Sequence, residues 1–237
     1  MKVLIAVLST RTPPYGEMIE TSKATWDSTE VPGVETIFYV GEPGSALDDR
    51  VVGFPVPEAY RTMGHKNLQA WKWMLENRDF DYMARVNASC YVHKARLLEN
   101  CVGLPATGYL AGSIYQGDEK RPTWLWGGHQ FLMSRDVVQD LVNNPHVWNH
   151  GEMDDVALSH AAAALGVQFS HGNHACAIDW LAEDLWRVVS TDGTNFEFTD
   201  WADVAKLTGQ HFFRCKIDLK RHLDAVVMKN LFTYLKP

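Results

Sequence analysis

The sequence lacks any apolar run long enough to cross a membrane. A membrane-spanning helix needs about 20 consecutive apolar residues, whereas the opening run, Val3–Leu8, has six. That run continues directly into Ser9-Thr10-Arg11 without a small-residue cleavage site, so it does not indicate a secretion signal. We therefore expect a soluble, cytoplasmic protein with no membrane span.

Cysteine is scarce and not arranged in pairs. The chain has four cysteines, at positions 90, 101, 176 and 215, and none of them forms a Cys-x-x-Cys motif. This spacing indicates neither a disulfide framework nor a cysteine zinc site, and it suits a reducing compartment. His171 and His174 lie close together in the sequence, but they lack a clear third ligand for zinc.

An excess of basic residues is also missing. The formal net charge is -7 and the pI is about 5.8. Such a chain has no general attraction for nucleic-acid phosphates or anionic membranes, although a local basic cleft can exist within an acidic surface.

Apolar residues, in contrast, are plentiful, at 46% of the 237 positions. The continuous run Val3–Leu8 is typical of a buried parallel strand. Residues 17–26 suit a helix, and the β-branched and aromatic residues 35–40 suit a second strand. The chain therefore opens with a βαβ unit.

Strands and helices continue to alternate along the rest of the sequence. Further helices are predicted at 66–77, 92–101, 137–141, 153–165 and 219–235, and further strands at 80–86, 109–115, 130–133, 167–169 and 211–216. This order predicts one α/β domain over residues 1–237, with a Rossmann-like, mixed but mostly parallel central sheet flanked by helices. We expect the last helix, 219–235, to pack on that domain.

Four short motifs carry polar groups that are candidates for chemistry. Lys66 precedes a helix with Trp71 and Trp73; a strand runs into Asn87-Ala88-Ser89; Gly127-Gly128 precedes a strand; and Asp154-Asp155-Val156 begins an alanine-rich helix. In this order they resemble the fringe-like and β-1,3-galactosyl- and N-acetylglucosaminyltransferases, which are inverting enzymes with the GT-A fold. The resemblance extends from the first strand to about Leu165.

The resemblance implies roles for several residues. Asp155 matches the catalytic base of the family, and Asp154, beside it, belongs to the acceptor and sugar pocket. A structural reading stays open, because either carboxylate could simply complement the positive end of the helix that follows. The donor implied by the family is a nucleotide sugar, and a UDP-sugar is the first choice.

The family usually has an Asp-rich triplet where this chain has Asn87-Ala88-Ser89. An amide and a hydroxyl carry no negative charge, so they would bind Mn²⁺ or Mg²⁺ only weakly; Ser89 and His211 are the remaining candidate ligands. We expect cationic groups to offset part of the diphosphate charge instead. The predicted donor site comprises Arg11, Lys66, Asn87, Ser89, His211, Arg214 and Lys216. The alternative for Asn87 and Ser89 is an ordinary polar turn.

The predicted acceptor and sugar pocket contains Trp124, Trp126, Gly127 and Gly128 as well as Asp154. The two glycines suit a close approach of the backbone to a ligand, or a positive φ. The tryptophans could offer a platform for a sugar face, or they could be core residues. Residues 211–216 alternate as in a strand, which separates His211 from Arg214 and Lys216; a lone histidine there could also be structural.

The sequence therefore predicts an inverting glycosyltransferase that transfers a sugar to a hydroxyl group. The acceptor could be a glycan, a protein or a hydroxymethylated base in viral DNA, and the overall acidity disfavours the last. The alternative is a non-catalytic glycan- or nucleotide-binding relative, because a decayed enzyme would also lack the acidic triplet.

Overall fold

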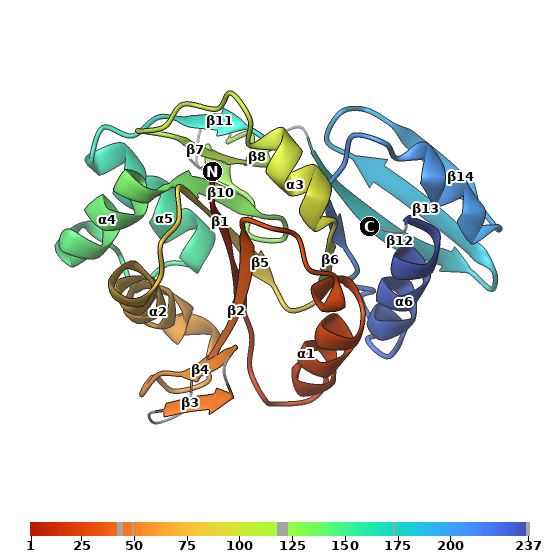
Figure 1. Cartoon of the computed structure of the whole chain (residues 1–237), viewed down its shortest axis with the longest axis horizontal. Helices are drawn as coiled ribbons and strands as arrows, with labels where there is room; N and C mark the ends of the chain where they lie inside the picture. Colours follow the sequence, from red (N-terminus) through yellow and green to blue (C-terminus); the bar gives the residue numbers. More distant parts are fainter. Residues whose placement is uncertain (42–44, 49, 118–122, 173, 236–237) are drawn as a thin grey trace.

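An eight-stranded sheet runs through the middle of the protein, and a five-stranded sheet lies beside it (Figure 1). The structure is a computed structural model that describes residues 1–41, 45–48, 50–117, 123–172 and 174–235. The order of the large sheet is β11-β7-β10-β5-β1-β2-β4-β3. Its strands are β1 (Val3–Leu8), β2 (Val34–Val40), β3 (Ser45–Asp48), β4 (Val51–Gly53), β5 (Tyr82–Asn87), β7 (Leu110–Gly112), β10 (Phe131–Ser134) and β11 (Phe169–His171).

The opening βαβ unit is confirmed. Strand β1 pairs in parallel with both β2 and β5, with Val3 opposite Val34 on one side and Tyr82 on the other. Strand β10 runs antiparallel to β5 and β7, and β3 runs antiparallel to β4. The sheet is thus mixed but mostly parallel, as predicted.

Helices cover both faces of this sheet (Figure 1). One face carries α2 (Met63–Asn77), α4 (Arg135–Asn143) and α5 (Asp154–Ala164), and the other carries α1 (Tyr15–Ala24) and α3 (Lys94–Asn100). Short 3₁₀ helices are η1 (Trp26–Ser28), η2 (Tyr60–Thr62), η3 (Pro145–Val147) and η4 (Trp201–Lys206). The last helix, α6 (Leu223–Leu235), packs against α1, η4 and strand β6 (Cys90–Val92) of the second sheet.

The alternation of side chains along β1 explains why two layers of helices are needed. Val3, Ile5 and Val7 belong to the hydrophobic cluster on the α1 side, whereas Leu4, Ala6 and Leu8 belong to the cluster on the α2 side. Successive residues of a strand point to opposite faces, so a strand without polar residues must be covered on both.

The second sheet corrects the predicted alternation of strands and helices. Its order is β14-β13-β12-β15-β6. The strands are β6 (Cys90–Val92), β12 (Ala175–Ala182), β13 (Leu185–Ser190), β14 (Asn195–Phe198) and β15 (Phe212–Arg214), and a separate pair is formed by β8 (Ile114–Tyr115) and β9 (Trp124–Leu125). Residues 175–198 therefore form an antiparallel meander, in which Trp186 and Val188 are buried and Arg187 and Val189 are exposed.

Two predicted helices begin later than expected. The helix predicted at 92–101 begins at Lys94, because Cys90–Val92 pairs with β15 as an edge strand of the second sheet. The helix predicted at 219–235 begins at Leu223, because the chain turns at Leu219, which has a φ of 67°. A residue in that left-handed conformation cannot continue a right-handed helix.

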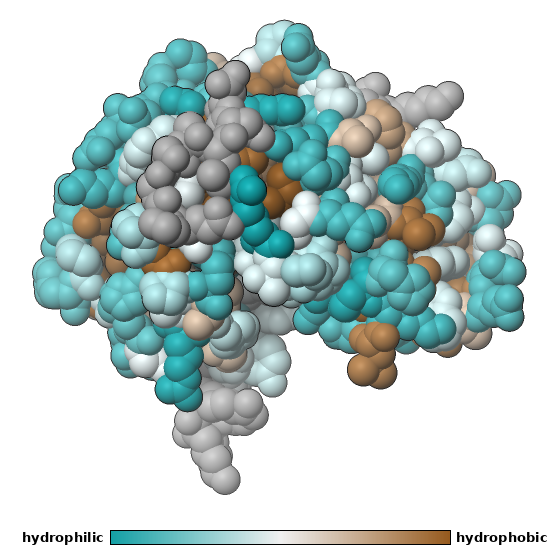
Figure 2. Space-filling model, turned by 90° about the horizontal axis from the view of Figure 1, so that it is seen from below, coloured by the Kyte–Doolittle hydropathy of each residue, from teal (hydrophilic) through white to brown (hydrophobic). Residues whose placement is uncertain are grey.

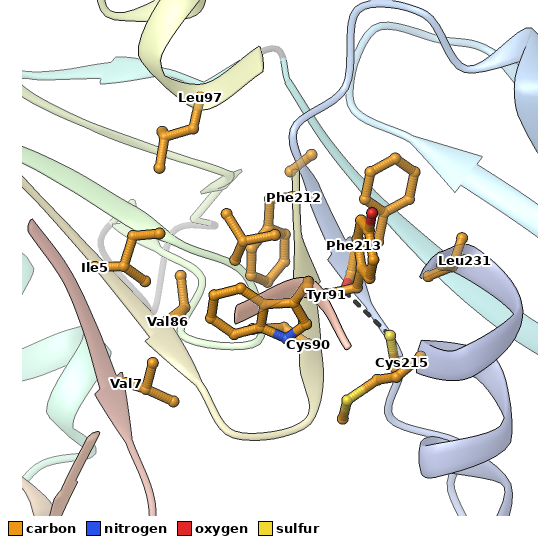
Figure 3. Close-up of a cluster of buried hydrophobic side chains, with 14 of the residues drawn as sticks. Ile5, Val7, Val86, Cys90, Tyr91, Leu97, Phe212, Phe213, Cys215 and Leu231 are labelled. Atoms are coloured by element: carbon orange, nitrogen blue, oxygen red, sulfur yellow. Dashed lines mark hydrogen bonds between the residues drawn. The ribbon is translucent and has the colours of Figure 1, made fainter. Parts of the chain in front are cut away.

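The two sheets share one hydrophobic core (Figure 3). Ile5, Val7 and Val86 of the large sheet lie near Phe212 of the second sheet, and Leu231 approaches from α6. The rings of Tyr91 and Phe213 meet edge to face, with centroids 5.6 Å apart. Burying one such large apolar side chain contributes about 1.5–3 kcal/mol, so this shared cluster joins the sheets firmly.

The surface is correspondingly polar. Figure 2 shows a face on which hydrophilic residues predominate and apolar residues gather in small, separate patches. Over the part of the chain that the structure describes, no helix is both long and apolar enough to span a lipid bilayer.

Candidate active site

A cleft of about 610 Å³ opens at the carboxyl ends of β1 and β5. Its volume is in the range of typical ligand sites, about 300–1,000 Å³, and ligands of open α/β sheets usually bind at this edge. The lining side chains come from the ends of β1 and β5 and from the starts of α1, α2 and α5, with the residues next to them. Others belong to η2, to β8 and β9, and to β15 with the residues that follow it.

A buried ion pair lies at the floor of this cleft. Arg85 in β5 is 1% exposed, and its guanidinium binds the carboxylate of Asp154 at the start of α5. Asn67 of α2 donates a second hydrogen bond to the same carboxylate, at 3.2 Å. Sequence reasoning missed Arg85, although a cation inside an otherwise apolar strand is a signal, because a buried arginine needs a partner.

Asp155 lies beside this pair and lines the cleft. Its carboxylate accepts hydrogen bonds from the backbone N–H of Gly127 and from that of Val156, both at 2.9 Å. Burial raises the pKa of Asp155, and the two backbone N–H groups partly counteract that rise. The carboxylate thus accepts hydrogen bonds at the beginning of α5 and also faces a cavity. Asp155 can therefore stabilise the start of the helix and act as a base.

Gly127 and Gly128 are required by close approach, since neither has a positive φ. A Cβ atom on Gly127 would lie 2.9 Å from the Asp155 carboxylate, and one on Gly128 would lie 2.7 Å from the Trp126 ring. The Gly127 carbonyl also accepts a 2.7 Å hydrogen bond from the Asn87 amide. Gly127 therefore lets the loop pack directly on the candidate base, and Gly128 leaves room for the Trp126 ring.

Three of the predicted donor-site cations line the cleft: Lys66, Arg214 and Lys216. Lys66 is 3% exposed and contacts Glu58 Oε2 and the Ser9 carbonyl, each at 2.7 Å; burial lowers its pKa. Lys216 pairs with Asp218 at 3.0 Å. The Arg214 guanidinium lies 4.9 Å from the centroid of the Trp126 ring.

Two predicted donor residues do not reach the cleft. His211 is 1% exposed and lines a separate cavity of about 80 Å³. Its Nδ1 lies 2.8 Å from the Asn100 amide nitrogen, its Nε2 lies 3.0 Å from Gln130 Oε1, and burial lowers its pKa to about 3. Arg11 is exposed between Thr10 and Thr12, which line the cleft, but it is not itself a lining residue.

An aromatic and apolar rim surrounds Asp155, and most of it was missed in the sequence. Tyr60, Tyr115, Trp126 and Met153 all line the cleft, although they are 65%, 44%, 37% and 43% exposed. Trp124 stacks on Tyr115 with ring centroids 4.3 Å apart. Exposed aromatic rings around a cavity suit the binding of a flat or ring-shaped ligand.

The described residues of the cleft provide no free carboxylate for a divalent metal ion. The carboxylates among its described lining residues belong to Glu58, Asp154 and Asp155, and each one is already engaged, by Lys66, by Arg85 and by backbone N–H groups respectively. At the end of β5 the amide of Asn87 is bound to Gly127. Within the described ranges, no three histidine, cysteine or acidic side chains come together as a metal site. The described lining residues therefore do not fit Mn²⁺ or Mg²⁺, which prefer several free carboxylate oxygens.

Comparison with known proteins supports the fold. No family model and no curated protein matches the sequence. The structure is similar to that of a glycosyltransferase involved in the glycosylation of the major capsid of PBCV-1, with a TM-score of 0.53 and 10% identity over 95% of this chain and 99% of that one. The glycosyltransferase GlyE of Streptococcus pneumoniae TIGR4 matches with TM-scores of 0.44 and, for its apo form, 0.43, at 10% identity over 73% of this chain and 45% of that chain. The predicted α/β fold of the GT-A type is confirmed.

Proposed function

We propose that this protein is an inverting glycosyltransferase that uses a nucleotide sugar, with UDP-sugars as the first candidates. The observation that carries the proposal is the position of Asp155, a carboxylate with a raised pKa in the cleft of a glycosyltransferase-like fold. A base made more basic by burial is better able to accept a proton from an alcohol.

The arrangement of the other motifs supports membership of the fringe-like group. Lys66, Ser89, Gly128 and Asp155 are far apart in the sequence, yet all four line one cleft. Asn-Ala-Ser at the end of β5 then stands where that group has its acidic triplet.

The proposed reaction is a direct displacement at the anomeric carbon. The acceptor O–H gives its proton to the Asp155 carboxylate while the acceptor oxygen forms a bond to the anomeric carbon. The bond from that carbon to the diphosphate oxygen breaks, its electron pair leaves with the diphosphate, and the anomeric configuration inverts. Gly127 holds Asp155 through a 2.9 Å hydrogen bond, which orients the base towards the cleft.

The rim around Asp155 suits the acceptor side of the reaction. Tyr60 presents an exposed ring on which a sugar or a nucleobase could stack. A glycan, a protein hydroxyl and a hydroxymethylated DNA base all remain candidate acceptors, and the net charge of -7 disfavours a DNA duplex. We also propose a cytoplasmic location, because all four cysteines are free and buried.

A second candidate function is a non-catalytic glycan- or nucleotide-binding protein. It is favoured by one observation, the lack of any carboxylate at Asn87, Ala88 and Ser89 at the end of β5.

Nucleotide release separates the two candidates. Purified protein is incubated with a panel of UDP-sugars and with glycoside, peptide and 5-hydroxymethylcytosine oligonucleotide acceptors, and the released UDP is quantified. We expect acceptor-dependent release that falls by about 10²- to 10⁴-fold in Asp155→Asn, with unchanged affinity for UDP. Asp140→Asn, an exposed change on α4, is the matched control and should keep full activity.

Full activity of Asp155→Asn would contradict the role of the base. Retained sugar binding without turnover on any donor would favour the non-catalytic alternative.

A further inference from the structure

Among the described residues that line the cleft, one cation, Arg214, has no hydrogen bond or ion pair within the protein. Four basic side chains belong to the described lining residues: Lys66, Arg85, Arg214 and Lys216. The first pairs with Glu58, the second with Asp154 and the fourth with Asp218. The guanidinium of Arg214 makes no hydrogen bond or ion pair with any residue that the structure describes, so its five N–H donors are available to a ligand.

The position of Arg214 is set by the second sheet. Strand β15 pairs with β6 so that Arg214 lies opposite Cys90, and the next residue, Cys215, donates a 3.0 Å backbone hydrogen bond to the Ser89 carbonyl. The cation therefore stands beside the end of β5, at the edge of the sheet where Asn87 and Ser89 also line the cleft.

Two neighbours fix the orientation of the guanidinium. It lies over the Trp126 ring at 4.9 Å, a cation–π contact that is stronger when partly shielded from water. A Cβ atom on Gly128 would lie 2.8 Å from Arg214 Nη1, so only glycine leaves room for the side chain in this position. A planar guanidinium held in this way matches the geometry of phosphate oxygens.

A departing nucleoside diphosphate needs fixed positive charge at the oxygen that receives the electron pair. The donor set at the end of β5 does not fit a divalent cation, as described above. We propose that Arg214, held by Trp126 and Gly128, binds the diphosphate of the donor in place of a metal ion, and that donor binding is independent of Mn²⁺ and Mg²⁺. This inference rests on the proposed transfer from a nucleotide sugar.

The proposed sugar transfer needs only the donor, the acceptor and these side chains. The bond from the anomeric carbon to the β-phosphate oxygen breaks, and its electron pair moves to that oxygen, where the N–H groups of Arg214 donate hydrogen bonds to the growing negative charge. The acceptor proton moves to Asp155, so no net charge has to leave the cleft during transfer.

The test measures binding of UDP and of uridine by calorimetry, with the protein in EDTA and again in excess Mn²⁺. Uridine is the internal control, because it lacks the phosphates that Arg214 would contact. We expect the same UDP affinity in both buffers. Arg214→Gln should weaken UDP binding roughly ten- to hundredfold, the usual range for a charge-assisted hydrogen bond, and leave uridine binding unchanged.

Two further variants test the positioning. Gly128→Ala should weaken UDP relative to uridine in the same direction, because its methyl group displaces the guanidinium. Arg214→Lys should recover only part of the affinity, since an ammonium lacks the bidentate geometry. Arg78→Gln removes the same charge at the opposite end of the strands, where Arg78 pairs with Glu35 near the start of β2, and should change nothing. Thermal melts establish that each variant is folded.

The possible failures can be told apart. UDP binding that requires Mn²⁺, or an Arg214→Gln variant that weakens UDP and uridine equally, would overturn the inference and leave the proposed transferase intact. If wild-type protein binds none of UDP, GDP, CDP and ADP in either buffer, the proposed function fails and this inference fails with it.

Discussion

The stability of the protein should depend on the charge of Asp154, because Asp154 forms a buried ion pair with Arg85. Asp154→Asn keeps the size of the side chain but removes its charge. The guanidinium of Arg85 is 1% exposed, and its hydrogen bond to the Gly127 carbonyl is a long one, at 3.4 Å. The substitution therefore removes the carboxylate that pairs directly with a buried cation and leaves Asp155 as a neighbouring negative charge.

The expected loss can be worked out from this geometry. Removing one partner of a buried ion pair costs about 3–5 kcal/mol, because the remaining charge stays desolvated. In a protein of this size, 1 kcal/mol corresponds to a Tm change of about 2–4 °C. Asp154→Asn should therefore lower the Tm by roughly 6–20 °C.

Urea unfolding followed by circular dichroism, together with a thermal melt, measures the effect. The matched control is Asp179→Asn, because Asp179 pairs with Arg187 at 2.8 Å on the surface, where the side chains are 40% and 45% exposed. An exposed pair contributes at most about 1 kcal/mol. The double variant Arg85→Met/Asp154→Leu removes both charges and should recover much of the loss, since buried pairs can often be replaced by apolar residues.

A loss below about 1 kcal/mol in Asp154→Asn, equal to that of the surface control, would refute the reasoning. It would mean that Arg85 reaches water or another acceptor when Asp154 is neutral. A double variant less stable than Asp154→Asn alone would show that packing at this site outweighs charge.

Three further predictions concern the cleft and the core. In a pH–rate profile, the acid limb of kcat/KM should lie above the ordinary aspartate pKa, because burial raises the pKa of Asp155. The base is lost as the pH falls through that raised value. An acid limb at the ordinary pKa would contradict this prediction. Gly127→Ala should lower kcat more than it raises the KM for the donor, because the new methyl group would lie 2.9 Å from the Asp155 carboxylate; steady-state kinetics measures this, and unchanged kcat would contradict the contact. Thiol labelling with Ellman's reagent should be slow in the native protein and fast in urea, because all four cysteines are buried and burial raises the pKa of Cys101 to about 12; rapid native labelling would contradict that burial.

The first half of the fold was predictable because its signals are local. The uninterrupted apolar run Val3–Leu8 demands cover on both faces, and that requirement alone indicates a parallel sheet between layers of helices. Gly166, with a φ of 76°, ends the helix of Asp155 as its sequence position suggests.

The second sheet was missed because its strongest evidence is not local. Cys90–Val92 is too short to be recognised as a strand, and it is stabilised by pairing with β15, more than 100 residues later. The hairpin of β12 and β13 carried only a weak sequence signal, because Val189 is apolar although it points outwards, which interrupts the alternation that begins with Trp186, Arg187 and Val188.

The candidate site was predictable in part for the same reason. Residues next to strand or helix ends, such as Lys66 and Asp155, were found because short motifs carry them. Tyr60 and Met153 were not, because nothing in the sequence around an exposed side chain shows that the fold will bring it to a cavity. His211 and Arg214 are three positions apart, and only the pairing of β15 decides which of them faces the cleft.

The short step from β5 to β6 has a mechanical consequence. Two residues, Ala88 and Ser89, carry the chain from one sheet into the next, and Ala88 is itself anchored by a 3.0 Å hydrogen bond to the Leu8 carbonyl. Because this connection is short, it holds the end of β5 close to β6 and to its partner strand β15, which carries Arg214. One inserted residue would lengthen the connection by up to about 3.5 Å, which exceeds the tolerance of a hydrogen bond. The short connection thus limits how far the two sheets can move apart at this edge.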